Sequence, residues 1–343
     1  MTELARVILA DAKRSVIGID FSGLRNKTIS ITGASGLVGT YLLAGLANIS
    51  RENRPKKIYA IFQSKPEKHW KEIADRVHAT LLRGDLCDNI FTDGLPKSDM
   101  IIHAGGYGQP GKFMIDPLKT ITLNTAVTLK LLEKLKLKGS FVFISSSEVY
   151  SGLINPPHKE NQIGRTNTDH PRSCYIESKR CGEAIVFSAR SRGVDAKSVR
   201  LSLAYGPGTK IDDKRVLNSF IGRALIERKI EMMDGGEALR TYCYITDATH
   251  MIWNILLHGK ENIYNVGGVS RTTIAKLAKL IGKLIQVPVV IPKQKKQALV
   301  SAPEDVRLDL SKTKKEFGKK VFVSFEDGVQ KTITWQKELY KQF

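Results

Sequence analysis

Two kinds of hydrophobic pattern alternate along the chain between residue 27 and about residue 201. Short apolar runs typical of buried strands are expected at residues 28–32, 57–62, 78–82, 100–103, 140–145 and 197–201. Apolar residues with helical spacing lie between them, at residues 37–48, 115–135 and 174–191. Strands that alternate with helices in this way are typical of a parallel sheet with right-handed crossovers. We therefore expect an α/β fold with a doubly wound parallel sheet.

The segments on either side of this region have a different texture. Residues 1–26 carry Leu4, Val7, Ile8 and Ala12 at helical spacing, which predicts an N-terminal helical extension. After residue 204 come turns rich in Gly and Pro, a helix at 216–228 and short strands, which predict a smaller lobe. We divide the chain into an extension (1–26), a main domain (27–203) and a C-terminal α/β lobe (204–343) interleaved with it.

Composition excludes several classes of protein. Of the 343 residues, 42% are hydrophobic and 26% are charged, so the chain can bury a full core. The four cysteines show no zinc-ligand or disulfide-framework spacing, and no metal is expected. No apolar run has the length of a membrane span, so we expect a cytoplasmic protein with no membrane association. The formal net charge of +20 favours anionic ligands, but the lysines are not interleaved with aromatic residues as in a nucleic-acid platform.

A glycine-rich loop follows the first expected strand. It reads Gly33-Ala34-Ser35-Gly36-Leu37-Val38-Gly39 and runs directly into a helical pattern. Glycines at this spacing allow a tight turn and a close approach to a pyrophosphate, whose charge the helix N-terminus stabilises. The sequence therefore predicts a Rossmann-type dinucleotide site in residues 27–203.

The cofactor's adenosine end is less well defined. Where an acidic residue would bind the ribose 2′-hydroxyl of NAD, the second strand ends in Gln63-Ser64-Lys65. Gln63 or Ser64 could bond the hydroxyl and Lys65 could accept a 2′-phosphate, so NAD is expected and NADP is not excluded. Asp85 follows the third strand, where it could bond the adenine amino group or cap a helix.

Tyr175 and Lys179 lie four residues apart in a helical pattern and therefore share one face. An ammonium close to a phenol favours the phenolate, and so we expect Lys179 to lower the pKa of Tyr175 and make it a general base. A hydroxyl-rich strand end, Ser145-Ser146-Ser147, precedes this pair along the chain.

These features together resemble the nucleotide-sugar epimerase/dehydratase family of extended short-chain dehydrogenases/reductases, from residue 27 to about 338. The matching segments are Gly33 to Gly39, Gly84-Asp85-Leu86, His103-Ala104-Gly105, Asn124-Thr125, Ser146 to Tyr150, Tyr175 to Lys179, Tyr205 to Gly208, Arg240 to Asp247, Tyr264 to Gly268 and Asp309 to Lys312. The resemblance implies that Tyr175 takes the proton of the sugar 4-hydroxyl while hydride leaves C4, giving a 4-keto sugar. Ser146 would hydrogen-bond the same oxygen, and Lys179 would tune Tyr175 and bind the nicotinamide ribose.

The same resemblance implies the binding residues. The cofactor residues would be Gly33, Ser35, Gly36, Leu37, Val38, Gly39, Gln63, Asp85, Leu86, Ala104, Gly105, Asn124, Tyr175 and Lys179. The substrate residues would be Ser147 and three arginines at phosphate-binding positions, Arg215, Arg240 and Arg307. A homodimer through helices near 115–135 and 174–191 is also expected.

The residues after Ser146 decide which reaction follows oxidation. In the sugar 4,6-dehydratases this segment resembles Thr-Asp-Glu. In the present sequence Ser147 takes the place of the aspartate. The UDP-glucuronate decarboxylases carry a Ser/Thr-Ser-Glu pattern, which Ser146-Ser147-Glu148 matches, and Pro171 to Arg180 is also similar to them. The resemblance therefore favours decarboxylation, with Glu148 as a catalytic residue.

Two departures from the decarboxylase pattern keep other reactions open. Leu203 replaces an asparagine that contacts substrate, and the sugar-facing loop at 105–110 differs from the usual sequence. A 4-epimerase, a 4,6-dehydratase and a 4-dehydrogenase remain alternatives. A non-catalytic RNA-binding protein of the same fold is the alternative from another class, and the presence of Ser146, Tyr175 and Lys179 argues against it.

Overall fold

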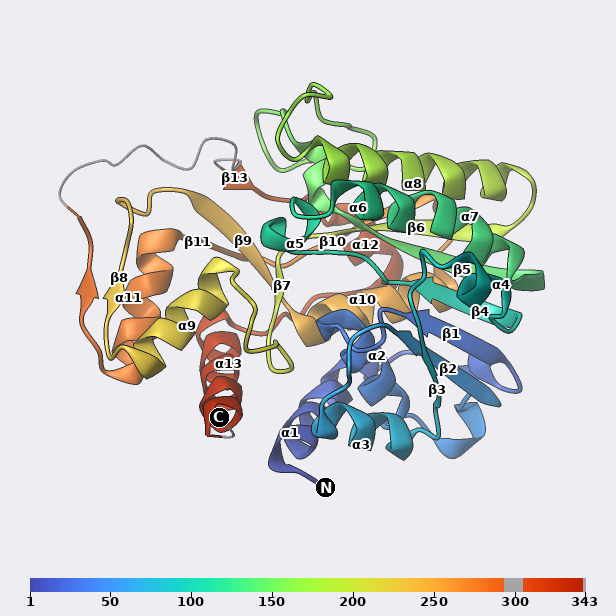
Figure 1. The fold of residues 1–343 in the computed structure, drawn as a ribbon, viewed down its shortest axis with the longest axis horizontal. Coiled ribbons are helices and arrows are strands. Elements are labelled where there is room, and N and C mark those ends of the chain that lie inside the picture. The colour runs from blue at the N-terminus through green and yellow to red at the C-terminus, as the bar shows by residue number, and fades with distance from the viewer. Residues whose placement is uncertain (293–304, 342–343) are drawn as a thin grey trace.

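A seven-stranded parallel sheet forms the centre of the computed structural model, which describes residues 1–292 and 305–341 (Figure 1). In spatial order its strands are β10 (Ile263–Val266), β6 (Asp195–Leu201), β5 (Leu135–Ser146), β4 (Ser98–His103), β1 (Thr28–Thr32), β2 (Lys57–Phe62) and β3 (Thr80–Arg83). All neighbouring strands run parallel. The chain winds outward in opposite directions from β1 and β4, which confirms the doubly wound Rossmann-type fold. Ligands of such sheets bind at the carboxyl ends of the strands near this point.

Helices cover both faces of the sheet (Figure 1). One face packs against α6 (Pro117–Asn124), α7 (Ala126–Glu133) and α8 (Ser173–Ser191), and the other against α2 (Leu37–Leu46), α3 (Lys68–Arg76) and α10 (Ile245–His258). Side chains of β5 alternate between these layers: Phe141 and Phe143 join the α6–α8 side, whereas Val142 and Ile144 join the opposite core. Shorter helices α4 (Asn89–Asp93), α5 (Pro110–Phe113) and η4 (Ser147–Tyr150) follow β3, β4 and β5.

A smaller lobe extends beyond the carboxyl end of the sheet. Its sheet joins β7 (Ala204–Tyr205), β9 (Leu239–Tyr244), β11 (Ser270–Thr273) and β13 (Asp305–Val306), and β8 (Ile230–Glu231) pairs with β12 (Val289–Val290). Its helices are α9 (Val216–Ile226), α11 (Ile274–Ile285) and α13 (Phe325–Tyr340). The chain after residue 204 also returns to the main sheet, where α10, β10 and α12 (Ser311–Phe317) pack.

The first residues form α1 (Glu3–Ala12), followed by the short turns η1 (Lys13–Val16) and η2 (Ser22–Leu24); η3 (Arg51–Asn53) precedes β2. Helix α1 packs on α2, α3 and α13. Near its end, the Asp11 carboxylate accepts hydrogen bonds from Tyr41 on α2 (2.9 Å) and Tyr244 on β9 (2.7 Å). Lys331 on α13 forms an ion pair with the other oxygen at 2.7 Å. The extension thus links the main domain to the lobe.

Several elements differ from the sequence-based expectation. The single helix at 115–135 is wrong, because it breaks at Thr125 into α6 and α7. Thr125 has φ −117° and ψ −81°, which lies outside the α-helical range. Strand β5 begins at Leu135 instead of residue 140, with a register shift opposite Ser98. Strand β10, which carries Tyr264 and Asn265, was not expected.

Over residues 1–292 and 305–341, no helix combines the length and apolar character that crossing a membrane requires. In the same residues, no group of His, Cys, Asp and Glu is arranged to hold a metal ion.

Candidate active site

The glycine-rich loop connects β1 to α2 and packs directly on the end of β4. Gly33 has φ +64°, and a Cβ there would overlap the carbonyl oxygen of Ala104. A Cβ on Gly39 would lie 2.5 Å from the Gly33 carbonyl oxygen. Only glycine fits at these two positions. Ser35, Gly36, Leu37 and Val38 complete the turn into α2, whose first N–H groups have no partner within the helix. They form a cradle suited to a pyrophosphate.

The adenosine end of this cradle lies at the ends of β2 and β3. Gln63 Nε2 donates to Asp85 Oδ2 at 2.9 Å, and Lys119 Nζ donates to the same oxygen at 2.5 Å. Burial tends to raise the pKa of Asp85, but the bonds from Lys119, the Cys87 amide and Gln63 outweigh it and hold the pKa below its ordinary value. Asp85 is therefore ionised and fixed in place. Leu86 beside it is buried.

The turn after β4, with Ala104 and Gly105, is held by a buried relay. The Thr32 hydroxyl accepts from the Gly105 amide (3.0 Å) and pairs with His103 Nδ1 (2.8 Å), while His103 Nε2 lies 2.9 Å from the Leu123 carbonyl oxygen. Because a carbonyl can only accept, Nε2 carries the proton and Nδ1 accepts from Thr32. Burial lowers the pKa of His103 to about 4, so its ring is neutral and structural.

Tyr175 and Lys179 lie on one face of α8, as predicted, and both are buried. Burial raises the pKa of Tyr175 to about 12 and lowers the pKa of Lys179 to about 7. Lys179 Nζ donates to the Ile144 carbonyl oxygen (2.7 Å) and lies 5.8 Å from the Tyr175 ring centroid. The expectation that Lys179 lowers the pKa of Tyr175 in the protein alone is therefore wrong, because burial opposes both charged forms.

Asn124 completes this corner from the end of α6. Its Nδ2 donates to the Ser178 hydroxyl and the Thr120 carbonyl oxygen, both at 3.0 Å. Its Oδ1 is buried and has no hydrogen-bond partner among the described residues. A Cβ on Gly106 would lie 3.4 Å from Asn124 Oδ1 and 3.8 Å from Lys179 Nζ, so both atoms border one backbone segment. An unsatisfied acceptor beside a buried amine suits the hydroxyl groups of a bound ribose.

The short helix η4 carries the residues expected to choose the reaction. Ser146 ends β5, and its Oγ accepts from the Glu148 amide at 3.2 Å. Ser147 is buried, and Glu148 Oε1 accepts from Arg172 Nη2 at 2.7 Å. A hydrogen bond from Ser146 lowers the pKa of Tyr175, partly offsetting its burial. The structure thus brings Ser146, Glu148 and Tyr175 together.

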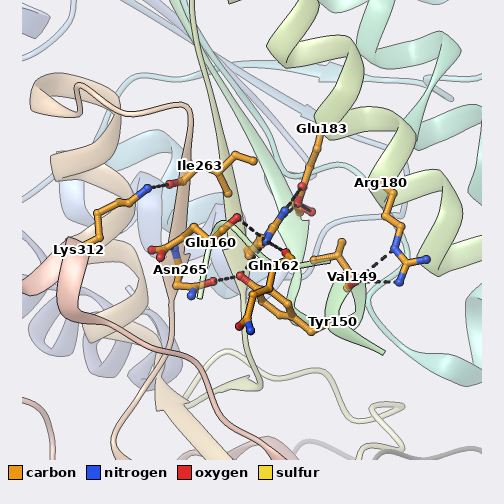
Figure 2. A network of polar contacts seen from close by, with 11 residues as sticks. Val149, Tyr150, Glu160, Gln162, Arg180, Glu183, Ile263, Asn265 and Lys312 are labelled. Atoms are coloured by element: carbon orange, nitrogen blue, oxygen red, sulfur yellow. Dashed lines mark hydrogen bonds and ion pairs between the residues drawn. The ribbon is translucent and has the colours of Figure 1, made fainter. Parts of the chain in front are cut away.

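Two arginines, Arg180 and Arg200, donate hydrogen bonds to residues of η4. Figure 2 shows Arg180 of α8 beside Val149, to whose carbonyl oxygen it donates from Nε (3.2 Å) and Nη2 (2.9 Å). The Tyr150 hydroxyl donates to Asn265 Oδ1 of β10 at 2.8 Å and accepts from Arg200 Nη1 at 2.8 Å. The turn is therefore fixed by α8, β6 and β10 together.

Arg200 of β6 also forms a buried ion pair with Glu183 of α8, next to the end of β5. Its Nε and Nη2 donate to Glu183, the shortest contact being 2.8 Å, and its Nη1 donates to the carbonyl oxygens of Glu160 and Gln162. Ser145 donates to the same carboxylate at 2.6 Å. Only 3% of the Arg200 side chain and 6% of the Glu183 side chain are exposed.

The three arginines expected to bind substrate come from the lobe side. Arg215 precedes α9 and pairs with Asp213 at 2.6 Å, while Arg240 lies on β9 and burial lowers its pKa. Arg215 lowers the pKa of Tyr175, and Glu148 acts on Arg240 in the opposite sense to burial, so both arginines lie within electrostatic reach of the site. Arg307 donates to the carbonyl oxygen of Pro156 (2.5 Å), in the loop after η4, and no described contact joins it to Tyr175 or Glu148.

Comparison with known proteins agrees with this geometry. A sequence profile of the NAD dependent epimerase/dehydratase family matches residues 29–267. The chain belongs to this family. Among curated relatives, UDP-glucuronic acid decarboxylase 6 of Arabidopsis thaliana is 28% identical over 309 residues, covering 89% of this chain and 87% of the relative. UDP-glucuronic acid decarboxylase 1 of Xenopus tropicalis is 27% identical, covering 92% and 74%. This chain is therefore an NAD-dependent enzyme of the nucleotide-sugar type.

The epimerase/dehydratase fold is also found in the solved structures. UDP-glucose 4-epimerase of Thermotoga maritima with UDP-glucose superposes with a TM-score of 0.76 at 23% identity, covering 91% of this chain and 99% of that one. MoeE5 in complex with UDP-glucuronic acid and NAD gives 0.72 at 19% identity, with the same coverage. The glycine cradle and the unsatisfied Asn124 oxygen independently fit a dinucleotide, so the expected cofactor, NAD, agrees with the family.

Two residues that contact Glu148 or Tyr175 were not among the functional residues expected from the sequence. Arg172 precedes α8 and binds Glu148, and Phe113 on α5 stacks on Tyr175 with ring centroids 4.5 Å apart. Arg172 lies three residues before Tyr175 at the start of a helix. This spacing was the available sign in the sequence that Arg172 lies near Tyr175. Nothing in the sequence indicated Phe113.

Proposed function

We propose that this enzyme decarboxylates a nucleotide-diphosphate uronic acid, with UDP-glucuronate as the leading substrate, through a transient 4-ketone. The observation that carries the proposal is the η4 turn, where an uncharged Ser147 and Glu148, which pairs with Arg172, follow Ser146 next to the buried Tyr175. A 4,6-dehydratase of this family would need an acid where Ser147 lies. The curated decarboxylases, aligned over about nine-tenths of this chain, support the same reading.

In the oxidation step, Tyr175 accepts the proton of the sugar 4-hydroxyl, and Ser146 hydrogen-bonds the same oxygen. Bound NAD supplies the acceptor for the C4 hydride and a positive ring that favours the phenolate. Lys179 and Asn124 would hold the ribose of the cofactor. Because the pKa of Tyr175 is about 12 in the protein alone, we expect proton abstraction to depend on a filled cofactor site.

The second step needs little further catalysis from the protein. With a ketone at C4, the C5 carboxylate belongs to a β-keto acid, so the C5–C6 bond breaks and its electron pair enters an enolate as CO2 leaves. The proton that C5 gains comes from solvent and would be relayed by Glu148, and Tyr175 would return its own proton to O4 as C4 is reduced again. The overall reaction is a loss of CO2 with no net oxidation.

The remaining partners follow from the surface of the site. Arg215, Arg240 and Arg307 bind the diphosphate, since a guanidinium suits bidentate contacts with phosphate oxygens. We also propose a homodimer through the outer faces of α6, α7 and α8. Leu118, Ile121, Leu129 and Phe187 are exposed there, and light scattering on the purified protein tests the assembly.

The test is to incubate purified enzyme with UDP-glucuronate and a panel of other nucleotide sugars and to follow product mass and the absorbance of reduced cofactor. Loss of CO2 from UDP-glucuronate supports the proposal. Loss of water, loss of two hydrogens, or an unchanged mass with altered NMR couplings would replace it with a dehydratase, dehydrogenase or epimerase. No sugar turnover together with RNA retention would favour the binding-protein alternative.

Two variants locate the chemistry. Tyr175→Phe should abolish cofactor reduction while NAD binding is retained. Glu148→Gln should still oxidise C4 and accumulate reduced cofactor and a 4-keto sugar. A Glu148→Gln enzyme as fast as the wild type would make Glu148 structural and remove the main support for the decarboxylase.

A further inference from the structure

Arg172 and Glu148 form a partly buried ion pair near Tyr175. Arg172 Nη2 lies 2.7 Å from Glu148 Oε1, with 12% and 19% of the two side chains exposed. Within the described part of the chain, the hydrogen-bond partner of the second carboxylate oxygen is the Ser151 hydroxyl, at a long distance of 3.4 Å. Arg172 is therefore the main group that fixes the direction of the Glu148 carboxylate, and in this shielded position the pair is stronger than a surface ion pair.

The ring of Phe113 links this pair to the general base. Phe113 is buried, stacks on Tyr175 at 4.5 Å with an angle of 8° between the rings, and lies 5.5 Å from the Arg172 guanidinium carbon. The Cys174 thiol also contacts the Phe113 carbonyl oxygen at 3.5 Å. Phe113 thus contacts both Arg172 and Tyr175, and the nearest anionic partner of the cation is Glu148.

The two charges act on Tyr175 in opposite directions. Beyond burial and the Ser146 hydrogen bond, Glu148 raises the pKa of Tyr175, and Arg172 and Arg215 lower it. The polar and charged groups that face Tyr175 from the surrounding elements are Ser146, Glu148, Arg172, Lys179 and Arg215. Removing Arg172 alone would leave Glu148 without its ion-pair partner beside the phenol, with Arg215 and Arg240 as more distant cations.

We propose that Arg172 is a positioning residue with two effects: it orients the Glu148 carboxylate toward the sugar and offsets the charge of that carboxylate at Tyr175. The first effect rests on the proposed function, in which Glu148 acts after C4 oxidation. The second concerns Tyr175 and can be measured without any sugar. A lysine would supply the charge but not the planar guanidinium, whose carbon lies 5.5 Å from the Phe113 ring centroid.

The sugar-free test is a pH titration of holoenzyme labelled with ¹³C at tyrosine Cζ, in which the Tyr175 resonance is identified by its absence in Tyr175→Phe. Arg172→Gln should move the Tyr175 titration up by about half to one pH unit, and Glu148→Gln should move it down by about as much. The Arg172→Gln/Glu148→Gln double variant should titrate close to wild type. Arg190→Gln is the matched control, because Arg190 lies at the far end of α8 and pairs with the exposed Asp195.

The proposal is overturned if Arg172→Gln titrates like Arg190→Gln, or if the double variant keeps the full shift of Arg172→Gln. Cancellation in the double variant separates an electrostatic role from simple loss of structure. Because the readout needs no sugar, it decides the role of Arg172 at Tyr175 even if UDP-glucuronate is not the substrate.

The kinetic test addresses the orientation of Glu148. Arg172→Gln should lower kcat on the uronic acid substrate about 100-fold with a smaller change in KM. Reduced cofactor should accumulate, because oxidation at C4 is then faster than the step that follows it. Arg172→Lys should recover part of kcat, and Arg190→Gln should match wild type. Equal kcat for Arg172→Gln and Arg190→Gln would refute the orienting role, whereas an inactive wild type would refute the proposed function instead.

Discussion

We predict a large effect on stability when the buried ion pair between Arg200 of β6 and Glu183 of α8 is broken. Arg200→Met removes the cation and leaves the Glu183 carboxylate with the Ser145 hydroxyl as its hydrogen-bond donor among the described residues, in a site where only 6% of the side chain is exposed. Breaking a buried pair by removing one partner costs about 3–5 kcal/mol, because a charge is left buried without compensation. We therefore expect the free energy of unfolding to fall by about 3–5 kcal/mol.

Urea unfolding followed by both tryptophan fluorescence and circular dichroism measures this loss, and coincident transitions are required before a free energy is derived. The control is Arg190→Met, which breaks a pair that is far more exposed (26% and 44%) and should cost about 0–1 kcal/mol. The Arg200→Met/Glu183→Leu double variant should recover most of the loss, since no charge is then left buried. A loss below about 1 kcal/mol for Arg200→Met, or a double variant as unstable as the sum of the singles, would refute this reasoning.

Three further predictions follow from burial at the site. Because burial lowers the pKa of Lys179 from 10.5 to about 7, wild-type stability should rise with pH between these values. Lys179→Met should accordingly gain about 2–4 kcal/mol at pH 6 in urea unfolding while losing C4 oxidation; equal or lower stability would contradict this. The pKa of His103 falls from 6.5 to about 4, so its contribution to stability is complete above pH 6.5 and is lost as pH falls toward 4. His103→Asn should reduce the stability loss between pH 7 and 4.5 by about 2–3 kcal/mol, and an unchanged loss in unfolding curves would argue for a charged ring. Gly39→Ala would bring a Cβ within 2.5 Å of the Gly33 carbonyl oxygen, so NAD affinity measured by calorimetry should fall at least about tenfold; retained affinity would show that the loop can yield.

Local patterns in the sequence were enough to predict β1, β2 and the helix face that carries Tyr175 and Lys179. Strands β1 and β2 match the expected residues at both ends, and Tyr175 and Lys179 share a helix face because their spacing is one helical turn. The break at Thr125 was missed because it is a change in the backbone angles of one residue, which apolar periodicity does not report. Strand β10 is short and comes from the far part of the chain, so its place in the main sheet is a matter of tertiary structure.

The electrostatics of the site could not be predicted from the same patterns. A four-residue spacing places an amine near a phenol, but it does not show that both are buried, and burial reverses the expected effect on Tyr175. The pairing of Arg172 with Glu148 joins residues 24 positions apart across two elements. Phe113 enters the site only because α5 folds back on α8, which requires the whole loop after β4.

The N-terminal link through Asp11 has a consequence for where this protein can be divided. The family profile begins at residue 29 and ends at 267, yet α1 and α13 lie outside those limits and meet through the ion pair of Asp11 with Lys331. A chain trimmed to the profile would lose both helices, expose the buried face of α1's partners and leave the hydroxyls of Tyr41 and Tyr244 without their acceptor. The region that the family profile matches is therefore smaller than the unit that folds here, and any excision, fusion or permutation should keep the two ends of the chain.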